Sequence, residues 1–114
     1  YWYCEADGKI YFHGAKSGHK IDAIQRCDKA SFCVYDQGFR REGEWALNIK
    51  SVIVFGRIQK VEDAQKTEEI CRNLCAKFTD DPAYAQQEWE KSGKHTLCLA
   101  LTPEHMTGKL VNES

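Results

Sequence analysis

Three absences narrow what this 114-residue chain can be. It lacks a strong charge of either sign, because 16 lysine and arginine residues are interleaved with 17 aspartate and glutamate residues, giving a formal net charge of −1. A general nucleic-acid binder needs a basic stripe, so we expect no nucleic-acid partner. The sequence also lacks an apolar run as long as a membrane span and the charged and apolar regions of a signal peptide. We therefore expect no membrane partner.

The third absence concerns the six cysteines, which show neither a Cys-x-x-Cys pair nor the spacing of a zinc finger. Cys4, Cys33 and Cys98 fall inside predicted strands, where a thiol behaves as a small apolar group. Cys71 and Cys75 lie four residues apart on a predicted helix, on the same face as Ile70, Leu74 and Phe78. A disulfide framework is the alternative, but we favour reduced, buried cysteines, no metal site and a cytoplasmic protein.

The most informative segment that is present runs from Gly8 to Ile24. It predicts a strand over Lys9–His13, a tight turn with glycines at 14 and 18, and a helix that starts near Ser17. This order gathers free backbone N–H groups, the positive end of a helix and the side chains of His19 and Lys20, which suits a phosphate. It is not a P-loop, because the glycine spacing is too short and no Ser or Thr follows Lys20. A solvated loop remains the alternative.

Strands dominate the rest of the predicted structure. Tyr1–Glu5 and Lys9–His13 flank a hairpin turn, and further strands are predicted over Ala30–Asp36, Ile49–Val61 and Thr96–Thr102, the last ending before Pro103. Val52–Phe55 is continuously apolar, which indicates burial on both faces, in a barrel wall or under a partner subunit. Two helices begin at Asp63 and at Asp80 or Asp81, with Pro82 in the second one's first turn. We expect one domain, residues 1–114, built as an antiparallel barrel with helices outside it.

Five segments in one order carry a family resemblance that covers nearly the whole chain. They are residues 10–14 (Ile-Tyr-Phe-His-Gly), 18–24 (Gly-His-Lys-Ile-Asp-Ala-Ile), 31–34 (Ser-Phe-Cys-Val), 50–57 (Lys-Ser-Val-Ile-Val-Phe-Gly-Arg) and 104–109 (Glu-His-Met-Thr-Gly-Lys). Together they resemble the pyridoxamine 5′-phosphate oxidase-like flavoproteins, most closely the nitroimidazole-resistance (Nim-type) branch.

The resemblance implies a mainly β fold, the FMN-binding split β-barrel with flanking helices. Relatives usually carry two more strands before the position of Tyr1, so we expect a chain truncated at its N-terminus; a neighbouring subunit that fills the gap is the alternative. The resemblance also implies a homodimer that binds FMN at the subunit interface, as an oxidoreductase that passes two electrons to a small-molecule acceptor such as a nitroaromatic (5-nitroimidazole) compound. The alternative is a flavin- or haem-binding module without fast turnover. Hydrolysis is disfavoured, because no nucleophile–base pair or carboxylate dyad is visible.

The same resemblance assigns the cofactor-binding residues. Lys20 matches a phosphate contact, and His19 matches a position where relatives often have another basic group. Phe12, His13 and Gly14 match the strand end that passes the ribityl chain and the ring. His13 is also the candidate catalytic residue, as a donor to the flavin or a substrate contact; a histidine at the barrel rim is the alternative.

The remaining assignments lie on later segments. Ser51 would hydrogen-bond the ring edge, with Val52 beside it through its main chain; an ordinary strand serine is the alternative. Trp45 is the candidate wall of the substrate pocket, or else a loop anchor, whereas Trp89 is expected to pack in a core or an interface. His105 and Lys109 are expected to approach the partner's flavin.

Overall fold

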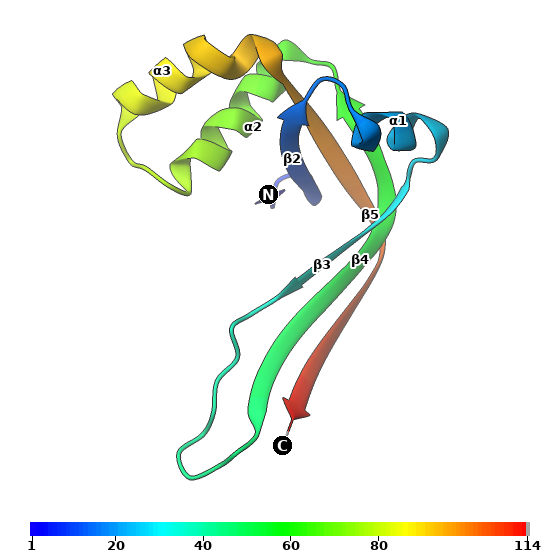
Figure 1. Ribbon diagram of the computed structural model, residues 1–114, viewed down its shortest axis with the longest axis vertical. Helices are drawn as coiled ribbons and strands as arrows, with labels where there is room; N and C mark the ends of the chain where they lie inside the picture. The colour runs from blue at the N-terminus through cyan, green and yellow to red at the C-terminus, as the bar shows by residue number, and fades with distance from the viewer. Residues whose placement is uncertain (114) are drawn as a thin grey trace.

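The computed structural model describes residues 1–113 as one antiparallel sheet with helices at its upper end (Figure 1). The elements are β1 (Trp2–Cys4), β2 (Lys9–Ala15), α1 (His19–Arg26), β3 (Lys29–Tyr35), β4 (Leu47–Val61), α2 (Ala64–Ala76), α3 (Pro82–Ser92), the 3-10 turn η1 (Gly93–His95) and β5 (Thr96–Glu113). The strand order is β1-β2-β5-β4-β3, so β1 and β3 are the edges of the sheet within the described residues. The prediction of a mainly antiparallel β fold with flanking helices is confirmed. No helix of residues 1–113 is both long and apolar enough to cross a membrane.

The two longest strands, β4 and β5, determine the shape of the molecule. They pair from Leu47↔Glu113 to Val61↔Cys98. Their distal halves and β3 extend away from the helices, and Figure 1 shows this extension, which we call the arm, reaching toward the C-terminus. The arm comprises residues 29–35, 47–55 and 105–113, and it accounts for a longest dimension of 52 Å.

A bulge joins the body of the sheet to the arm. The pairing shifts between Phe55 and Gly56, which lie opposite His105 and Pro103, so that Glu104 is the extra residue. The prediction that the last strand ends before Pro103 is therefore wrong. Proline has no N–H to give to a ladder, but a bulge tolerates it, and the strand continues to Glu113.

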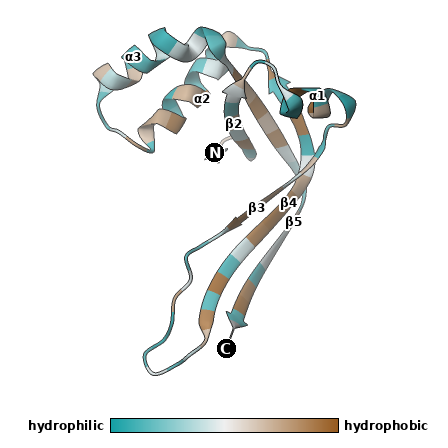
Figure 2. Ribbon diagram, in the orientation of Figure 1, coloured by the Kyte–Doolittle hydropathy of each residue, from teal (hydrophilic) through white to brown (hydrophobic). Residues whose placement is uncertain are grey.

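The alternation of side chains across the sheet creates two apolar clusters. On one face, Tyr11, Cys98 and Ala100 pack against Ile70 and Leu74 of α2. On the opposite face, Ile10, Val54 and Leu101 pack with partly buried neighbours, among them Phe12, Phe32 and Val52. Figure 2 shows the brown, hydrophobic segments continuing along β4 and β5 into the arm. The strands in the body are thus apolar on both faces, whereas α2 and α3 cover only one of them.

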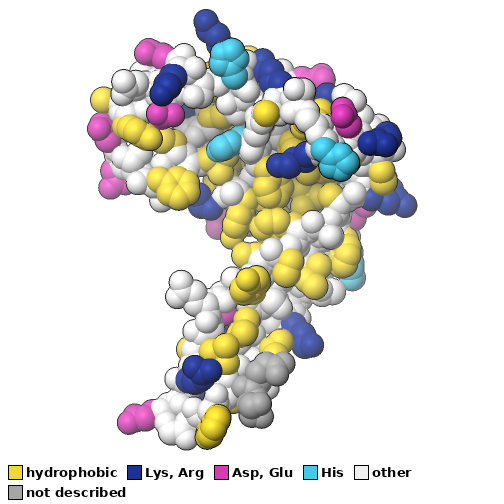
Figure 3. All heavy atoms as spheres, in the orientation of Figure 1, with side chains coloured by type: hydrophobic (Ala, Val, Ile, Leu, Met, Phe, Trp, Pro, Cys, Tyr) yellow, Lys and Arg dark blue, Asp and Glu magenta, His cyan; other side chains and the backbone are white. Residues whose placement is uncertain are grey.

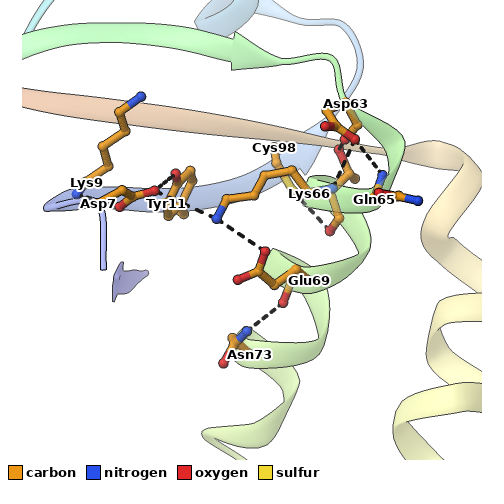
Figure 4. Close-up of polar contacts among 10 residues, drawn as sticks. Asp7, Lys9, Tyr11, Asp63, Gln65, Lys66, Glu69, Asn73 and Cys98 are labelled. Carbon is orange, nitrogen blue, oxygen red and sulfur yellow. Dashed lines mark hydrogen bonds and ion pairs between the residues drawn. The ribbon is translucent and has the colours of Figure 1, made fainter. Parts of the chain in front are cut away.

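An ionic network fastens the N-terminal hairpin to α2 (Figure 4). The Tyr11 hydroxyl donates to the Asp7 carboxylate, and the Lys66 Nζ lies 3.7 Å from Asp7 and 3.2 Å from Glu69. The same ammonium lies 5.1 Å from the centre of the Tyr11 ring, within cation–π range. The network therefore links the turn before β2, the strand itself and the first two turns of α2.

The helix starts follow the predicted capping rules. The Asp63 side chain accepts from the backbone N–H groups of Gln65 and Lys66, and Asp81 caps α3 with Pro82 at its first position. Both predictions are confirmed, whereas α1 begins at His19 rather than near Ser17. Its N-cap, Gly18, has φ 135°, which side chains rarely allow.

Two predictions about burial are wrong, and a third is not met by the single chain. Phe78 lies beyond the end of α2 and is 89% exposed, because the helix stops at Ala76. Cys33 is exposed, because its face of β3 has no layer above it. In the apolar run of β4, Val54 is buried but Ile53 and Phe55 are 38% and 47% exposed, so the chain alone does not cover both faces. All six cysteines are free thiols, of which Cys4 and Cys98 are buried. Cys27, after the end of α1, is exposed, so the expectation of buried cysteines is wrong for it too.

Candidate functional site

A small hollow lies where β2 ends and α1 begins. Its volume is about 150 Å³, and its lining residues come from β2, the following loop, the first turn of α1 and β5. They are Gly14, Ala15, Ser17, Gly18, His19, Lys20, Ile21, Leu97 and Leu99, and we call this hollow the loop pocket. Figure 3 shows histidine and lysine or arginine side chains gathered near α1, above a recess of hydrophobic side chains. The loop pocket thus has a basic rim and an apolar floor.

The start of α1 leaves several backbone donors without a helical partner. The amide of Asp22 donates to Gly18 O at 3.1 Å, and the three preceding amides in the helix have no residue four positions back within it. Gly18 has no side chain that could cap them, and no side-chain cap is formed at this end. These N–H groups and the positive end of the helix favour an anion, although Asp22 in the same turn supplies one opposing charge.

The structure brings three of the predicted site residues together: Gly14, His19 and Lys20 all line the loop pocket. Two more, Phe12 and Val52, lie on the same sheet face, where both pack against the Ile10–Val54–Leu101 cluster. The Phe12 ring lies 5.5 Å from the Phe32 ring in an edge-on arrangement. An apolar surface therefore leads from the loop pocket along this face of the sheet.

His13 and Ser51 lie on the opposite face of the sheet, because side chains alternate along a strand. His13 follows Phe12 in β2 and lines a different pocket, beneath α2 and α3. Ser51 pairs with Tyr35 and Lys109 in the arm. In the single chain the sheet separates both side chains from the loop pocket, and their assigned roles stay predictions.

The remaining predicted residues lie on the arm or its loop. Trp45 is 87% exposed in the loop between β3 and β4, which Figure 1 shows at the far end of the arm from α1. Its carbonyl accepts a hydrogen bond from Arg40 Nε at 3.0 Å. His105 stacks on Phe55 with ring centres 6.3 Å apart, and Lys109 lies opposite Ser51. The chain alone does not bring these three residues to the loop pocket.

A larger pocket, which the sequence did not reveal, lies between α2, α3 and the sheet. Its volume is about 390 Å³, and we call it the helix pocket. Its lining residues are His13, Cys71, Arg72, Leu74, Cys75, Phe78, Tyr84, Ala85, Glu88, Trp89, Ser92, Gly93 and Thr96. The spacing of Cys71 and Cys75 was the only signal of it in the sequence. Gly93, just after α3, packs closely against the Trp89 ring in the wall of this pocket, because a Cβ at Gly93 would lie 2.7 Å from that ring.

Two thiols meet beside the helix pocket. The Sγ atoms of Cys71 and Cys98 lie 3.8 Å apart, and Cys98 Sγ also lies 4.0 Å from the carbonyl oxygen of Thr67. The hydrogen bond between the two thiols lowers the pKa of Cys71 and outweighs burial, which raises it. The same bond, with burial, raises the pKa of Cys98. Among residues 1–113, no three His, Cys, Asp or Glu side chains are placed to hold a metal ion.

Comparisons with known proteins agree with this fold. Residues 1–110 match the family model described as pyridoxamine 5′-phosphate oxidase. A protein from Bacteroides thetaiotaomicron with a provisional assignment to 5-nitroimidazole antibiotic resistance has a similar structure, with TM-score 0.71 and 15% identity over 92% of this chain and 63% of its own. A conserved hypothetical protein from Mycobacterium tuberculosis gives TM-score 0.72 and 16% identity over 94% and 64%. An FAD-binding protein from Mesorhizobium loti gives 0.62 and 17% over 96% and 73%.

These comparisons show the fold and the family of the chain. The TM-scores to the three solved structures show a shared fold, and at identities of 15–17% they show the fold alone. The chain spans less than two thirds of the length of the first two. A comparison with curated proteins found no match. The family model, by contrast, covers residues 1–110, from β1 into the last strand. The chain therefore belongs to the pyridoxamine 5′-phosphate oxidase family and has the split-barrel type of fold.

Proposed function

We propose that this chain binds FMN with the phosphate in the loop pocket, and that it acts as part of an FMN-dependent oxidoreductase. The observation that carries the proposal is the joint placement of Gly14, Gly18, His19 and Lys20 around the N-terminus of α1. The family match and the FAD-binding relative from Mesorhizobium loti support a flavin as the ligand class.

The loop pocket fits the phosphate end of such a cofactor. At about 150 Å³ it is large enough for a phosphate group but too small for a whole flavin. A Cβ built at Gly14 or Gly18 meets no atom within 4 Å, so the backbone there is open to an approaching ligand. Lys20 supplies a full positive charge, and the first amides of α1 supply N–H donors, which together suit a dianionic phosphate.

The apolar face beside the loop pocket fits a flat ring. Leu97 and Leu99 floor the pocket, and Phe12 and Val52 continue the surface along β2 and β4. These side chains would cover one side of the ring and exclude water from it. When bound, FMN supplies two-electron transfer, whereas the residues of this chain bind and orient it.

We propose that a second copy of the chain completes the site. The arm exposes large apolar side chains on its three strands, namely Tyr35, Ile53, Phe55, Met106 and Leu110. Apolar side chains gathered on one elongated element mark a protein–protein interface more often than a solvated surface. A homodimer formed through the arm would cover both the apolar run of β4 and the outer side of a bound ring. For the acceptor, we propose a nitroaromatic compound, in line with the assignment of the Bacteroides relative.

A double comparison, of ligands with and without the phosphate and of proteins with and without Lys20, tests the proposal. The dissociation constants of FMN and of riboflavin, which lacks the phosphate, are measured for the wild type, Lys20→Ala and Lys16→Ala. Lys16 is the matched control, because it is an exposed lysine in the same loop and is not a lining residue of the loop pocket. We expect Lys20→Ala to weaken FMN binding roughly 10- to 100-fold, corresponding to about 1.4–2.8 kcal/mol, with little change for riboflavin. Equal losses for both ligands, or no loss at all, would contradict the proposed phosphate site.

Turnover is tested separately, on the FMN-loaded protein with NADH or NADPH as reductant and a 5-nitroimidazole as acceptor. Reduction of the nitro compound, dependent on both the flavin and the chain, is the expected result. Tight FMN binding without turnover across reductants would instead favour a flavin-binding module and overturn the oxidoreductase part of the proposal.

A further inference from the structure

We propose that Cys71 and Cys98 form a peroxide-reactive dithiol, in which Cys71 reacts with a hydroperoxide in the helix pocket and Cys98 then closes a disulfide. The proposal does not rest on flavin binding. The loop pocket and the helix pocket lie on opposite faces of the sheet. Cys71 lines the helix pocket, and Cys98 is buried in the core cluster on that same face.

The first support is the position of the two sulfurs. Cys71 on α2 and Cys98 on β5 lie 27 residues apart in the sequence, and their Sγ atoms approach to 3.8 Å. The S–S bond of a disulfide is about 2.05 Å long. The helix and the strand therefore need to approach each other by less than the length of a side chain for the bond to form. Cys75, one helical turn after Cys71, lines the same pocket and provides an internal comparison.

The second support is the difference in access. Cys71 is half-buried and lines the helix pocket, so that a small molecule can reach its sulfur. Cys98 is fully buried behind it, with contacts to Cys71 and to the Thr67 carbonyl. One thiol is therefore placed to meet an oxidant, and the other is placed to meet only the first thiol.

The third support is the chemistry of the pair. The hydrogen bond between the two thiols, at 3.8 Å, lowers the pKa of Cys71, which increases the fraction of reactive thiolate at a given pH. The charged and titratable groups around the pocket are His13 from β2, Arg72 from α2, and Tyr84 and Glu88 from α3. Phe78, Tyr84 and Trp89 make much of the wall aromatic, which fits an organic hydroperoxide.

The reaction balances with the hydroperoxide as the only co-reactant. The Cys71 thiolate attacks the terminal oxygen, the O–O bond breaks, and the leaving alkoxide takes up the proton lost by Cys71 and departs as an alcohol. The Cys98 sulfur then attacks the sulfur of the Cys71 sulfenic acid, the S–O bond breaks, and hydroxide leaves as water with the Cys98 proton. Two thiols are oxidised, and one hydroperoxide is reduced.

Peptide mapping of the oxidised full chain tests the proposal. The folded protein is treated with equimolar cumene hydroperoxide, remaining thiols are blocked with iodoacetamide, and the chain is digested with trypsin. Cleavage after Lys66, Arg72, Lys77, Lys94 and Lys109 puts Cys71 in peptide 67–72, Cys75 in 73–77 and Cys98 in 95–109. We expect peptides 67–72 and 95–109 to be cross-linked, with the mass of two hydrogen atoms lost. A cross-link through peptide 73–77, or full alkylation of every cysteine, would overturn the proposal.

Variants separate the two roles. Cys71→Ser is expected to abolish the cross-link, whereas Cys75→Ser, the matched control from the same wall, leaves it in place. Cys98→Ser is expected to leave a sulfenic acid on Cys71 that dimedone traps. Dimedone labelling of Cys75 in place of Cys71 would contradict the assigned order of reaction. The wild-type peptide map requires no variant, so it tests the proposal even if a substituted core fails to fold.

Discussion

Gly18 is the residue whose backbone does most to shape the loop pocket. Its φ of 135° with an extended ψ is a conformation that side chains rarely adopt, and it turns the chain directly into α1. A residue with a Cβ would have to relax this turn, which would move the first amides of the helix away from the proposed phosphate position.

Gly18→Ala is therefore expected to weaken FMN binding as well as stability. Gly43→Ala is the matched control, because Gly43 has φ 79° in the loop between β3 and β4 and, like Gly18, has open space around a Cβ. Both variants are expected to lose about 1–3 kcal/mol of unfolding free energy from strain. Only Gly18→Ala should lower FMN affinity in a fluorescence titration; an equal effect of Gly43→Ala would contradict a local role.

Asp7 gives the molecule a predictable dependence on pH. Burial raises its pKa, but the hydrogen bonds donated by Tyr11 and by the Lys9 amide outweigh burial, and the net pKa is lowered. A carboxyl group with a lowered pKa in the folded state stabilises that state above its unfolded pKa of about 3.9. The stabilisation is lost as the pH falls through the lower, folded-state value.

Asp7→Asn is thus expected to reduce the unfolding free energy at pH 7 by about 1 kcal/mol, the scale of one hydrogen bond. The difference from the wild type should shrink as the pH falls below 4, as measured by urea denaturation at several pH values. Asp80→Asn, at an exposed position before α3, is the control and should show no such trend. A loss that is constant with pH would show that the network acts through packing alone.

At the scale of elements, the bulge between β4 and β5 joins the body of the sheet to the arm. Gly56 lies so close to the partner strand that a Cβ would be 2.0 Å from the carbonyl oxygen of Thr102. The contact is with backbone, which cannot rotate away as a side chain would. Arg57, next in the strand, pairs with Asp28 at 2.6 Å and lies 3.5 Å from Glu104, so it links β4 to β5 and to the residue just before β3.

Gly56→Ala is accordingly expected to destabilise the fold by about 3 kcal/mol or more, the range of severe single substitutions. Gly108→Ala is the matched control in the same strand pair, because its Cβ would meet Ser51 O at an ordinary 3.9 Å. Thermal unfolding followed by circular dichroism measures both. Similar melting temperatures for the two variants would contradict the close approach at the bulge.

The sequence predicted helix and strand boundaries well where residues close together in the chain determine them. The caps at Asp63 and Asp81, the Asp-Gly hairpin and the strand starts follow from side chains within a few residues of each other. The continuation of β5 past Pro103 does not, because it depends on a bulge opposite Gly56, nearly fifty residues earlier in the chain. The burial of Cys33 and Phe78 was wrong for a related reason, since no layer covers either residue in the single chain.

In the candidate site, too, residues close in the sequence were predicted together, whereas residues that only the fold brings together were missed. Gly14, His19 and Lys20 were predicted together because they belong to one short segment, and the structure places them in one pocket. The helix pocket was missed because Cys71 and Cys98 meet only after α2 packs on the sheet. His13 was grouped with Phe12 and Gly14 by sequence, although a strand sends its side chain to the other face.

At the scale of the whole molecule, the arm carries large apolar side chains that the single chain leaves exposed. Tyr35, Ile53 and Phe55 lie on one face of it, and Met106 and Leu110 lie on the other. Both faces contain apolar side chains that a monomer exposes to water. Burial of such side chains contributes roughly 1.5–3 kcal/mol each, enough for a few of them to hold two chains together.

We expect Phe55→Lys to shift the proposed homodimer to monomer in size-exclusion chromatography with light scattering. Phe78→Lys is the control, because Phe78 is a more exposed phenylalanine that lies outside the arm. If Phe78→Lys dissociates the dimer and Phe55→Lys does not, the interface lies at the helices rather than at the arm.

The central claim, that this chain holds FMN, is tested most directly by adding FMN to the purified protein, removing the excess by gel filtration and recording the visible spectrum of the eluted species. The account predicts a flavin absorbance that travels with a protein of dimer size, in a ratio of one FMN per chain. A colourless protein peak, with all FMN eluting as free ligand, would contradict it.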